Sequence, residues 1–150
     1  MKHPLDITVS EFKNIRTPSS PREVNLHEWL LDEMYKDTVI RLRGAESKEE
    51  RDRIKMFELP AVTTSGTFSY RETGQLIRHS GLCCIDIDAG DNPHISDWEA
   101  AKHDLSKVVN IAYCALSVSG RGVFAIIPIA HPERHGEHFD LLKYAFTVLG

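Results

Sequence analysis

The stretch that decides the fold is Gly81-Leu82-Cys83-Cys84-Ile85-Asp86-Ile87-Asp88-Ala89. Its apolar first half, with a β-branched residue and two small thiols, is typical of a buried strand. Because strand side chains alternate between faces, Asp86 and Asp88 point the same way, while Ile85 and Ile87 point the other way. The Cα atoms of Asp86 and Asp88 are then roughly 6.6 Å apart at the usual strand rise. Two carboxylates at this spacing suit one divalent metal ion, or a pair of ions about 3.5–4 Å apart.

A second interpretation of the same aspartates needs no metal. The stretch Asp88-Ala89-Gly90-Asp91-Asn92-Pro93 is rich in turn-forming residues, so one aspartate would cap the turn while the other is solvated. Against this, two like charges on one face of a buried strand repel each other and lose hydration, and a cation removes both penalties. The sequence therefore favours a metal site at Asp86 and Asp88 and leaves the capping role open.

Composition narrows the class of protein. The chain has 150 residues, the length of a single domain, and a formal net charge of -4. A mildly acidic chain is not a generic electrostatic binder of nucleic acid, so any contact with a polyanion must be local or mediated by metal. The three cysteines (Cys83, Cys84 and Cys114) show no C-x-x-C spacing, which argues for reduced thiols in a cytoplasmic protein. No apolar stretch approaches the length of a membrane span, so no membrane partner is expected.

Residues 1–80, approximately, predict an N-terminal α/β unit. Three segments favour strands: one within Asp6–Asn14, one at Leu59–Thr64 and one at Gly66–Tyr70. Two segments favour helices, the first capped by Asn25 and running to about Tyr35, the second over Lys48–Phe57 behind the capping box of Ser47 and Glu50. Thr38–Arg43 fits either a strand or a helix. Arg71, Arg78 and His79 form a modest cationic cluster for which scattered surface charge is the default interpretation.

Residues 81–150, approximately, predict a second unit with a recognisable order. A helix is expected from about Ser96 to Val108, then strands at Ile111–Ser117 and Val123–Ile129, then a helix from about His135. Together with the aspartate strand this gives β-α-β-β-α, one strand short of the β-α-β-β-α-β unit of ferredoxin-like and RNA-recognition-motif folds. The expected fold is therefore α+β, with the last strand missing from this chain, and the chain is expected to be a fragment of a longer protein.

The turn Ser119-Gly120-Arg121-Gly122 belongs with the aspartates in this topology. The first and second strands run parallel because a helix joins them, so their carboxyl ends share one edge of the sheet. Glycines admit positive φ and let backbone N–H groups approach an anion, and Arg121 adds a planar fork suited to phosphate. These four residues are the predicted nucleotide-binding residues.

The motifs Cys84-Ile85-Asp86-Ile87-Asp88 and Ser119-Gly120-Arg121-Gly122-Val123 resemble those of the archaeo-eukaryotic primase and primase-polymerase superfamily. More closely, the chain looks like the VirE N-terminal-type domain of Bacteroidetes proteins and their mobile elements, over most of its length. The resemblance implies an RNA-recognition-motif-like palm, catalytic Asp86 and Asp88 holding Mg²⁺ or Mn²⁺, and a DNA primase- or polymerase-type nucleotidyltransferase if the domain is active. It also implies a nucleoside triphosphate and single-stranded template DNA as partners, and a helicase-like or other domain after this one.

Two positions depart from the superfamily pattern. Phe124 stands where the second motif normally ends in histidine, and phenylalanine cannot donate a hydrogen bond to a triphosphate. The carboxylate of the third motif would lie beyond Gly150. A non-catalytic nucleic-acid-binding module on the same fold is therefore the alternative function.

Three closely spaced histidines offer a second candidate metal site. His131, His135 and His138 follow Pro128 with H-x3-H-x2-H spacing. Histidines at a helix start are usually solvated, and no acidic or thiol partner is expected nearby, so these residues are not favoured as ligands.

Overall fold

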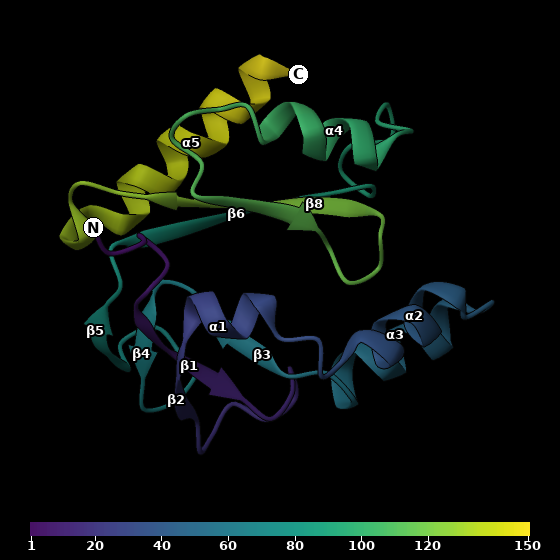
Figure 1. The fold of residues 1–150 in the computed structure, drawn as a ribbon, viewed down its shortest axis with the longest axis horizontal. Helices are drawn as coiled ribbons and strands as arrows, with labels where there is room; N and C mark the ends of the chain where they lie inside the picture. Colours follow the sequence, from purple (N-terminus) through teal and green to yellow (C-terminus); the bar gives the residue numbers. More distant parts are fainter. The chain divides into compact units, whose positions relative to one another are not determined.

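The computed structural model describes all residues from Met1 to Gly150, and its mixture of helices and small antiparallel sheets confirms the α+β class (Figure 1). Contacts divide the chain into two compact units. The first comprises Met1–Ser80 and Val118–Gly120, and the second comprises Gly81–Ser117 and Arg121–Gly150. Each unit is described by itself below. None of the helices is long and apolar enough to cross a membrane.

The first unit contains two small antiparallel sheets and three helices. The strands are β1 (Thr8–Phe12), β2 (Arg22–Asn25), β3 (Ala61–Thr63), β4 (Gly66–Phe68) and β5 (Leu76–His79). One sheet has the order β2-β1-β3 and the other pairs β4 with β5. The helices are α1 (Leu26–Leu31), α2 (Lys36–Gly44) and α3 (Lys48–Phe57). The strands β2 and β5 were not expected from the sequence.

Capping explains where the helices of this unit begin. The Asn25 side chain accepts a hydrogen bond from the Glu28 backbone at 3.1 Å, and the Ser47 side chain accepts one from Glu50 at 3.1 Å. Both predicted helix starts are therefore confirmed, and the bounds of α3 are those predicted. The expected continuation of α1 to Tyr35 is wrong, because the Asp32 backbone is extended and ends the helix after Leu31. Thr38–Arg43, left open by the sequence, lies within α2.

The hairpin of α2 and α3 has its own core. Leu42, Ile54 and Leu59 are buried together, and Val39 and Val118 pack against them. Val118 comes from the turn between two strands of the second half of the chain, so this core reaches a distant part of the sequence.

The second unit has the predicted β-α-β-β-α order. Its elements are β6 (Leu82–Asp88), α4 (Trp98–Leu105), β7 (Tyr113–Leu116), β8 (Gly122–Pro128), a 3-10 turn η1 (Pro132–Arg134) and α5 (His135–Leu149). The sheet order is β6-β8-β7, and β8 is antiparallel to both neighbours. It follows that β6 and β7 run parallel, as the helical crossover requires.

One face of this sheet is covered by helices. Figure 1 shows α4 and α5 on the same side of the sheet. The core on that side consists of Cys83, Ile85, Ala125 and Ile127, with Leu142 and Phe146 of α5 packed against it. Burial raises the pKa of the Cys83 thiol, as expected for a core cysteine.

The start of α4 differs from the prediction by one residue. Asp97, not Ser96, is the N-cap, and its side chain accepts from the Ala100 backbone at 2.9 Å. The capping box predicted for Ser96 and Glu99 is therefore wrong. Both residue types are good caps at adjacent positions, so local sequence does not choose between them.

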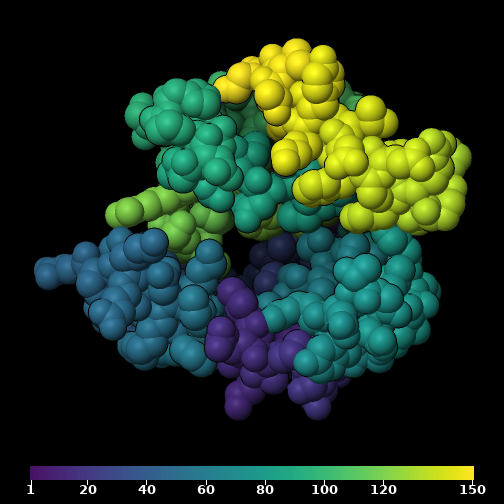
Figure 2. All heavy atoms as spheres, turned by 180° about the vertical axis from the view of Figure 1, so that it is seen from behind, coloured from purple at the N-terminus to yellow at the C-terminus, as the bar shows by residue number.

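The outer side of α5 is also apolar. Figure 2 shows the atoms of this helix, in yellow, at the surface of the molecule. Leu141, Tyr144 and Val148 are 67%, 71% and 68% exposed, although Leu142 and Phe146 on the same helix pack into the core. The helix therefore carries apolar side chains on two faces, of which the sheet covers one.

Candidate functional site

Asp86 and Asp88 lie at the carboxyl end of β6 on the face opposite the helices. Ile85, the residue before Asp86, packs in the core on the helix side of the sheet. The predicted alternation, with the aspartates and the isoleucines on opposite faces of the strand, is therefore confirmed. In the register of the sheet, Asp86 is opposite Phe124 and Asp88 is opposite Gly122. Directly opposed residues share a face of the sheet, so the two aspartates lie on one surface with Gly122 and Phe124 of β8.

Both aspartates are exposed. The expected loss of hydration at the two carboxylates is wrong, because only the first part of β6 is buried. Burial therefore does not force a cation onto them. Their placement on one face still provides two anionic oxygen donors at the same strand end.

Asp88 also caps the turn that follows the strand. Its Oδ1 atom accepts a hydrogen bond from the Asp91 backbone at 3.1 Å, and its main-chain oxygen accepts one from the Asn92 side chain at 3.0 Å. The turn-capping interpretation thus holds for one oxygen of Asp88. A carboxylate has two oxygens with several acceptor positions, so capping and metal binding are compatible.

The resemblance implies a Mg²⁺ or Mn²⁺ ion at Asp86 and Asp88, which together offer two carboxylates at one strand end. No group of three or more histidine, cysteine, aspartate or glutamate residues is placed to hold a metal ion. Two carboxylates are hard oxygen donors of the kind Mg²⁺ and Mn²⁺ prefer, and Mg²⁺ commonly takes only one or two of them, with waters and substrate phosphates as its other ligands. The pair fits such an ion when a phosphate ligand accompanies it.

The predicted nucleotide-binding turn joins β7 to β8. The Ser117 backbone donates to the Gly122 oxygen at 2.9 Å, and the Ala89 backbone donates to the Arg121 oxygen at 3.1 Å. The second of these bonds ties Arg121 directly to the residue after Asp88. Contacts assign Arg121 and Gly122 to the second unit, with the aspartates, and assign Ser119 and Gly120 to the first unit.

The two glycines of this turn serve different purposes. Gly120 has a φ of +71°, which favours glycine. Gly122 is required by close packing instead, because a Cβ atom there would lie 2.6 Å from the Ile87 carbonyl oxygen and 3.2 Å from the Asp88 Cα atom. The positive φ expected at both glycines is therefore found at Gly120 and is wrong for Gly122. Its missing side chain is what lets β8 pass close beside Asp88.

An aromatic pair lies on the same face as the aspartates. Phe124, opposite Asp86, contacts Tyr113 of β7 with ring centroids 5.9 Å apart and planes tilted by 35°. Burial raises the pKa of Tyr113, so its phenol stays neutral at physiological pH. The sequence analysis missed Tyr113, although alternation along its strand was the signal that could have found it.

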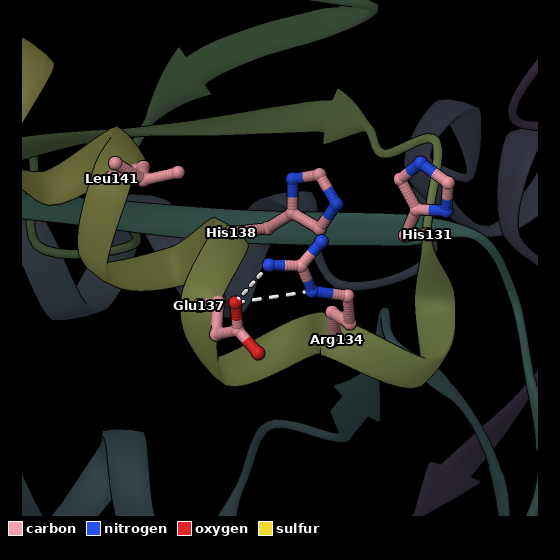
Figure 3. A pocket seen from close by; sticks show the side chains of 5 residues that line it. All are labelled: His131, Arg134, Glu137, His138 and Leu141. Carbon is pink, nitrogen blue, oxygen red and sulfur yellow. Dashed lines mark hydrogen bonds and ion pairs between the residues drawn. The ribbon is translucent and has the colours of Figure 1, made fainter.

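His131 and His138 line a pocket of about 80 Å³ together with Arg134, Glu137 and Leu141, and His135 is not part of its lining. These histidines belong to no group placed to hold a metal ion. Figure 3 shows Arg134 turned toward Glu137, whose carboxylate accepts from the Arg134 Nε atom at 3.0 Å. The His131 and His138 rings are nearly parallel with centroids 6.1 Å apart, and His131 also lies 3.2 Å from Glu133. The expectation that no acidic residue is nearby is therefore wrong. Glu133 pairs with His131, and Glu137 pairs with Arg134.

The lowered pKa of His135 predicts that the thermal stability of the protein depends on pH. Burial, followed by the nearby charge of His138, lowers the pKa of His135 below its ordinary value of 6.5. The unfolded chain then binds this proton at a higher pH than the folded chain, so stability is lost as pH falls through 6.5 toward the folded pKa. We expect the thermal midpoint to fall between about pH 7 and pH 5 and His135→Gln to reduce that fall. His103→Gln, on the exposed side of α4, is the control, and equal slopes in both variants would contradict the assignment.

Within the cationic cluster of Arg71, Arg78 and His79, Arg71 makes contacts that stabilise the fold of the first unit. Arg71 donates to the main-chain oxygens of Asn14 and Ile15 and lies over the Phe12 ring, 5.4 Å from its centroid. These bonds hold the loop after β1. They leave no argument for Arg71 as a phosphate contact.

Residues 55–146 match the family model described as BT4734-like, N-terminal domain. The chain belongs to this family. The BT4734-like match runs from the last turn of α3 into α5, so it includes both aspartates and the whole Ser119–Gly122 turn. No curated protein and no solved structure matches the chain.

Proposed function

We propose that this BT4734-like domain is a primase-polymerase-like nucleotidyltransferase unit that binds a nucleoside triphosphate with Mg²⁺ or Mn²⁺ at Asp86 and Asp88. The observation that carries the proposal is the register of β6 and β8, in which Asp88 is opposite Gly122 and Arg121 is hydrogen-bonded to Ala89. Two carboxylates and the end of a glycine-containing turn therefore share one strand end. The resemblance of both motifs to the primase-polymerase superfamily and to VirE N-terminal-type domains supports the same conclusion.

Each residue has a defined part in this proposal. Asp86 and Asp88 hold the divalent ion, which when bound supplies positive charge to phosphate oxygens. Arg121, which is exposed, donates a bidentate pair of hydrogen bonds to the triphosphate. Phe124 provides no such donor, so the contact that histidine makes in the superfamily falls here to Arg121 and to backbone N–H groups of the turn.

The wider context follows from the same resemblance. The proposed partners are a nucleoside triphosphate and single-stranded template DNA, in replication or maintenance of a mobile element in the cytoplasm. A further domain, helicase-like or of another kind, is proposed to accompany this one in the full-length protein.

Primer extension tests the proposed activity. Wild-type protein is incubated with a primed single-stranded template, labelled nucleotides and Mn²⁺, beside Asp86→Asn, Asp88→Asn and the control Asp91→Asn. We expect extension that needs Mn²⁺ and that falls by about 100-fold or more in the first two variants, because metal charge contributes several kcal/mol to such transfers. Asp91→Asn should extend normally, since Asp91 uses its backbone to contact Asp88. Extension that survives in Asp86→Asn and Asp88→Asn would refute the proposed role of the pair.

The aromatic pair favours a second candidate function, a non-catalytic nucleic-acid-binding module. Phe124 and Tyr113 lie on the strand face that RNA-recognition motifs use to stack bases. This alternative predicts binding of a fluorescent single-stranded oligonucleotide that is unchanged in EDTA and weakened in Phe124→Ala. Binding that disappears in EDTA would instead favour the metal-dependent function.

A further inference from the structure

Arg43 of α2 contacts the Ser119–Gly122 turn, although 75 residues separate it from Val118. Its Nε atom donates to the Val118 main-chain oxygen at 3.1 Å. The stem of the same side chain covers Gly120, where a Cβ atom would lie 3.4 Å from Nε and 3.6 Å from Cδ of Arg43. One side chain therefore contacts Val118, the residue before the turn, and Gly120 within the turn.

A second contact fixes the same end of the turn. The Val118 side chain packs against the buried cluster of Leu42, Ile54 and Leu59. Leu42 and Arg43 are adjacent in α2, so this helix contributes one residue to the cluster that packs against the Val118 side chain and donates to the Val118 carbonyl through the next. The backbone at Gly120 is held in a left-handed conformation immediately beyond this anchor.

Taken with the strand contacts, these bonds hold the turn from both ends. Ser117 donates to Gly122 across the base of the turn, and Arg121 accepts from Ala89. Anion binding by backbone N–H groups requires that successive groups keep a fixed orientation. A turn that moved relative to its base would lose that orientation and would pay an ordering cost on binding phosphate.

We propose that Arg43 is a positioning residue that sets the conformation of the Ser119–Gly122 turn for phosphate. The proposal rests on the proposed nucleotide-binding function for its purpose, but the positioning itself is a property of the protein without ligand. Arg43 holds the turn through its Nε hydrogen bond to Val118 and through the contact of its stem with Gly120. A positive charge at this position is therefore not sufficient to hold the turn. Arg43, Val118 and Gly120 belong to the same unit, so α2 contacts the part of the turn that lies in the first unit.

Amide hydrogen exchange in the ligand-free protein tests the positioning. The Ser117 and Ala89 amides report on closure of the turn, since each donates to it. In Arg43→Ala we expect both to exchange about 2- to 10-fold faster, the range that corresponds to loss of one hydrogen bond. Arg43→Lys keeps the charge and much of the stem but lacks Nε, so it should also exchange faster. Wild-type rates in Arg43→Ala, or in Arg43→Lys alone, would overturn the proposal.

Arg41→Ala is a matched control from the same helix. Arg41 is exposed and pairs with Glu58 at 2.6 Å, away from the turn. Its removal should leave the Ser117 and Ala89 exchange rates at their wild-type values. Faster exchange in Arg41→Ala to the same extent as in Arg43→Ala would show general loosening of α2 and would overturn the specific role.

Titration with inorganic triphosphate and Mn²⁺ separates this proposal from the proposed function. We expect Arg43→Ala to bind triphosphate about 2- to 10-fold more weakly while Mn²⁺ alone binds as in wild type. Absence of triphosphate binding in the wild-type protein would refute the proposed function and leave the exchange result to decide the role of Arg43. Equal triphosphate affinity in wild type and Arg43→Ala would overturn a positioning role in binding.

Discussion

Replacing Gly122 with alanine is expected to lower the free energy of unfolding by about 1–3 kcal/mol, the usual cost of overpacking. The new Cβ atom would lie 2.6 Å from the Ile87 carbonyl oxygen, a backbone atom that cannot rotate away. It would also lie 3.3 Å from the Ser117 hydroxyl. The strands β6 and β8 must separate locally to admit it, and Asp88 moves with β6. Urea unfolding of the wild-type and variant proteins measures the loss.

Gly136→Ala provides the control for this substitution. Gly136 lies in α5, and no atom is within 4 Å of a Cβ atom placed there. Alanine should therefore be neutral or stabilise the helix by about 0.5–1 kcal/mol. If Gly122→Ala unfolded at the same urea concentration as wild type, the close passage of β8 beside Asp88 would be contradicted.

Local sequence signals predicted those elements whose ends depend on neighbouring residues. The Ser47 cap and the charged pattern behind it specified α3 completely. By contrast, the apolar spacing that predicted a longer α1 included Met34. This side chain is 71% exposed and packs into neither described core, and the helix ends before it, at Leu31. The strand β2 has no apolar alternation and exists because β1 pairs with it, which is a tertiary cause.

The sequence was sufficient to predict which face of β6 carries Asp86 and Asp88, but not how exposed these side chains are. Alternation along β6 placed Asp86 and Asp88 on one face, and the β-α-β-β-α order placed the turn at their end of the sheet. Their exposure depends on what covers that face, which no pattern within the strand encodes. The need for Gly122 comes from the approach of two strands, and the contact of Arg43 with Val118 joins residues 75 positions apart. Neither leaves a local signal.

The Asp86→Asn/Asp88→Asn double variant is expected to lose metal-dependent triphosphate binding almost completely. Removing residues that merely support metal ligands typically costs about 10–100-fold in affinity, and removing the ligands themselves should cost more. Asparagine retains an acceptor oxygen, so the bond from the Asp91 backbone to position 88 can persist and the turn should keep its shape. The loss would then report on charge at the strand end and not on unfolding.

Calorimetric titration of a nucleoside triphosphate in the presence and absence of Mn²⁺ measures whether Asp86 and Asp88 form a metal–nucleotide site. Wild type, the double variant and the control Asp91→Asn are compared at equal protein concentration, with thermal unfolding as a check that all three fold. We expect saturable, Mn²⁺-dependent binding by wild type and Asp91→Asn, and none by the double variant. Absence of binding in wild type, or equal affinity in the double variant, would contradict a metal–nucleotide site at Asp86 and Asp88.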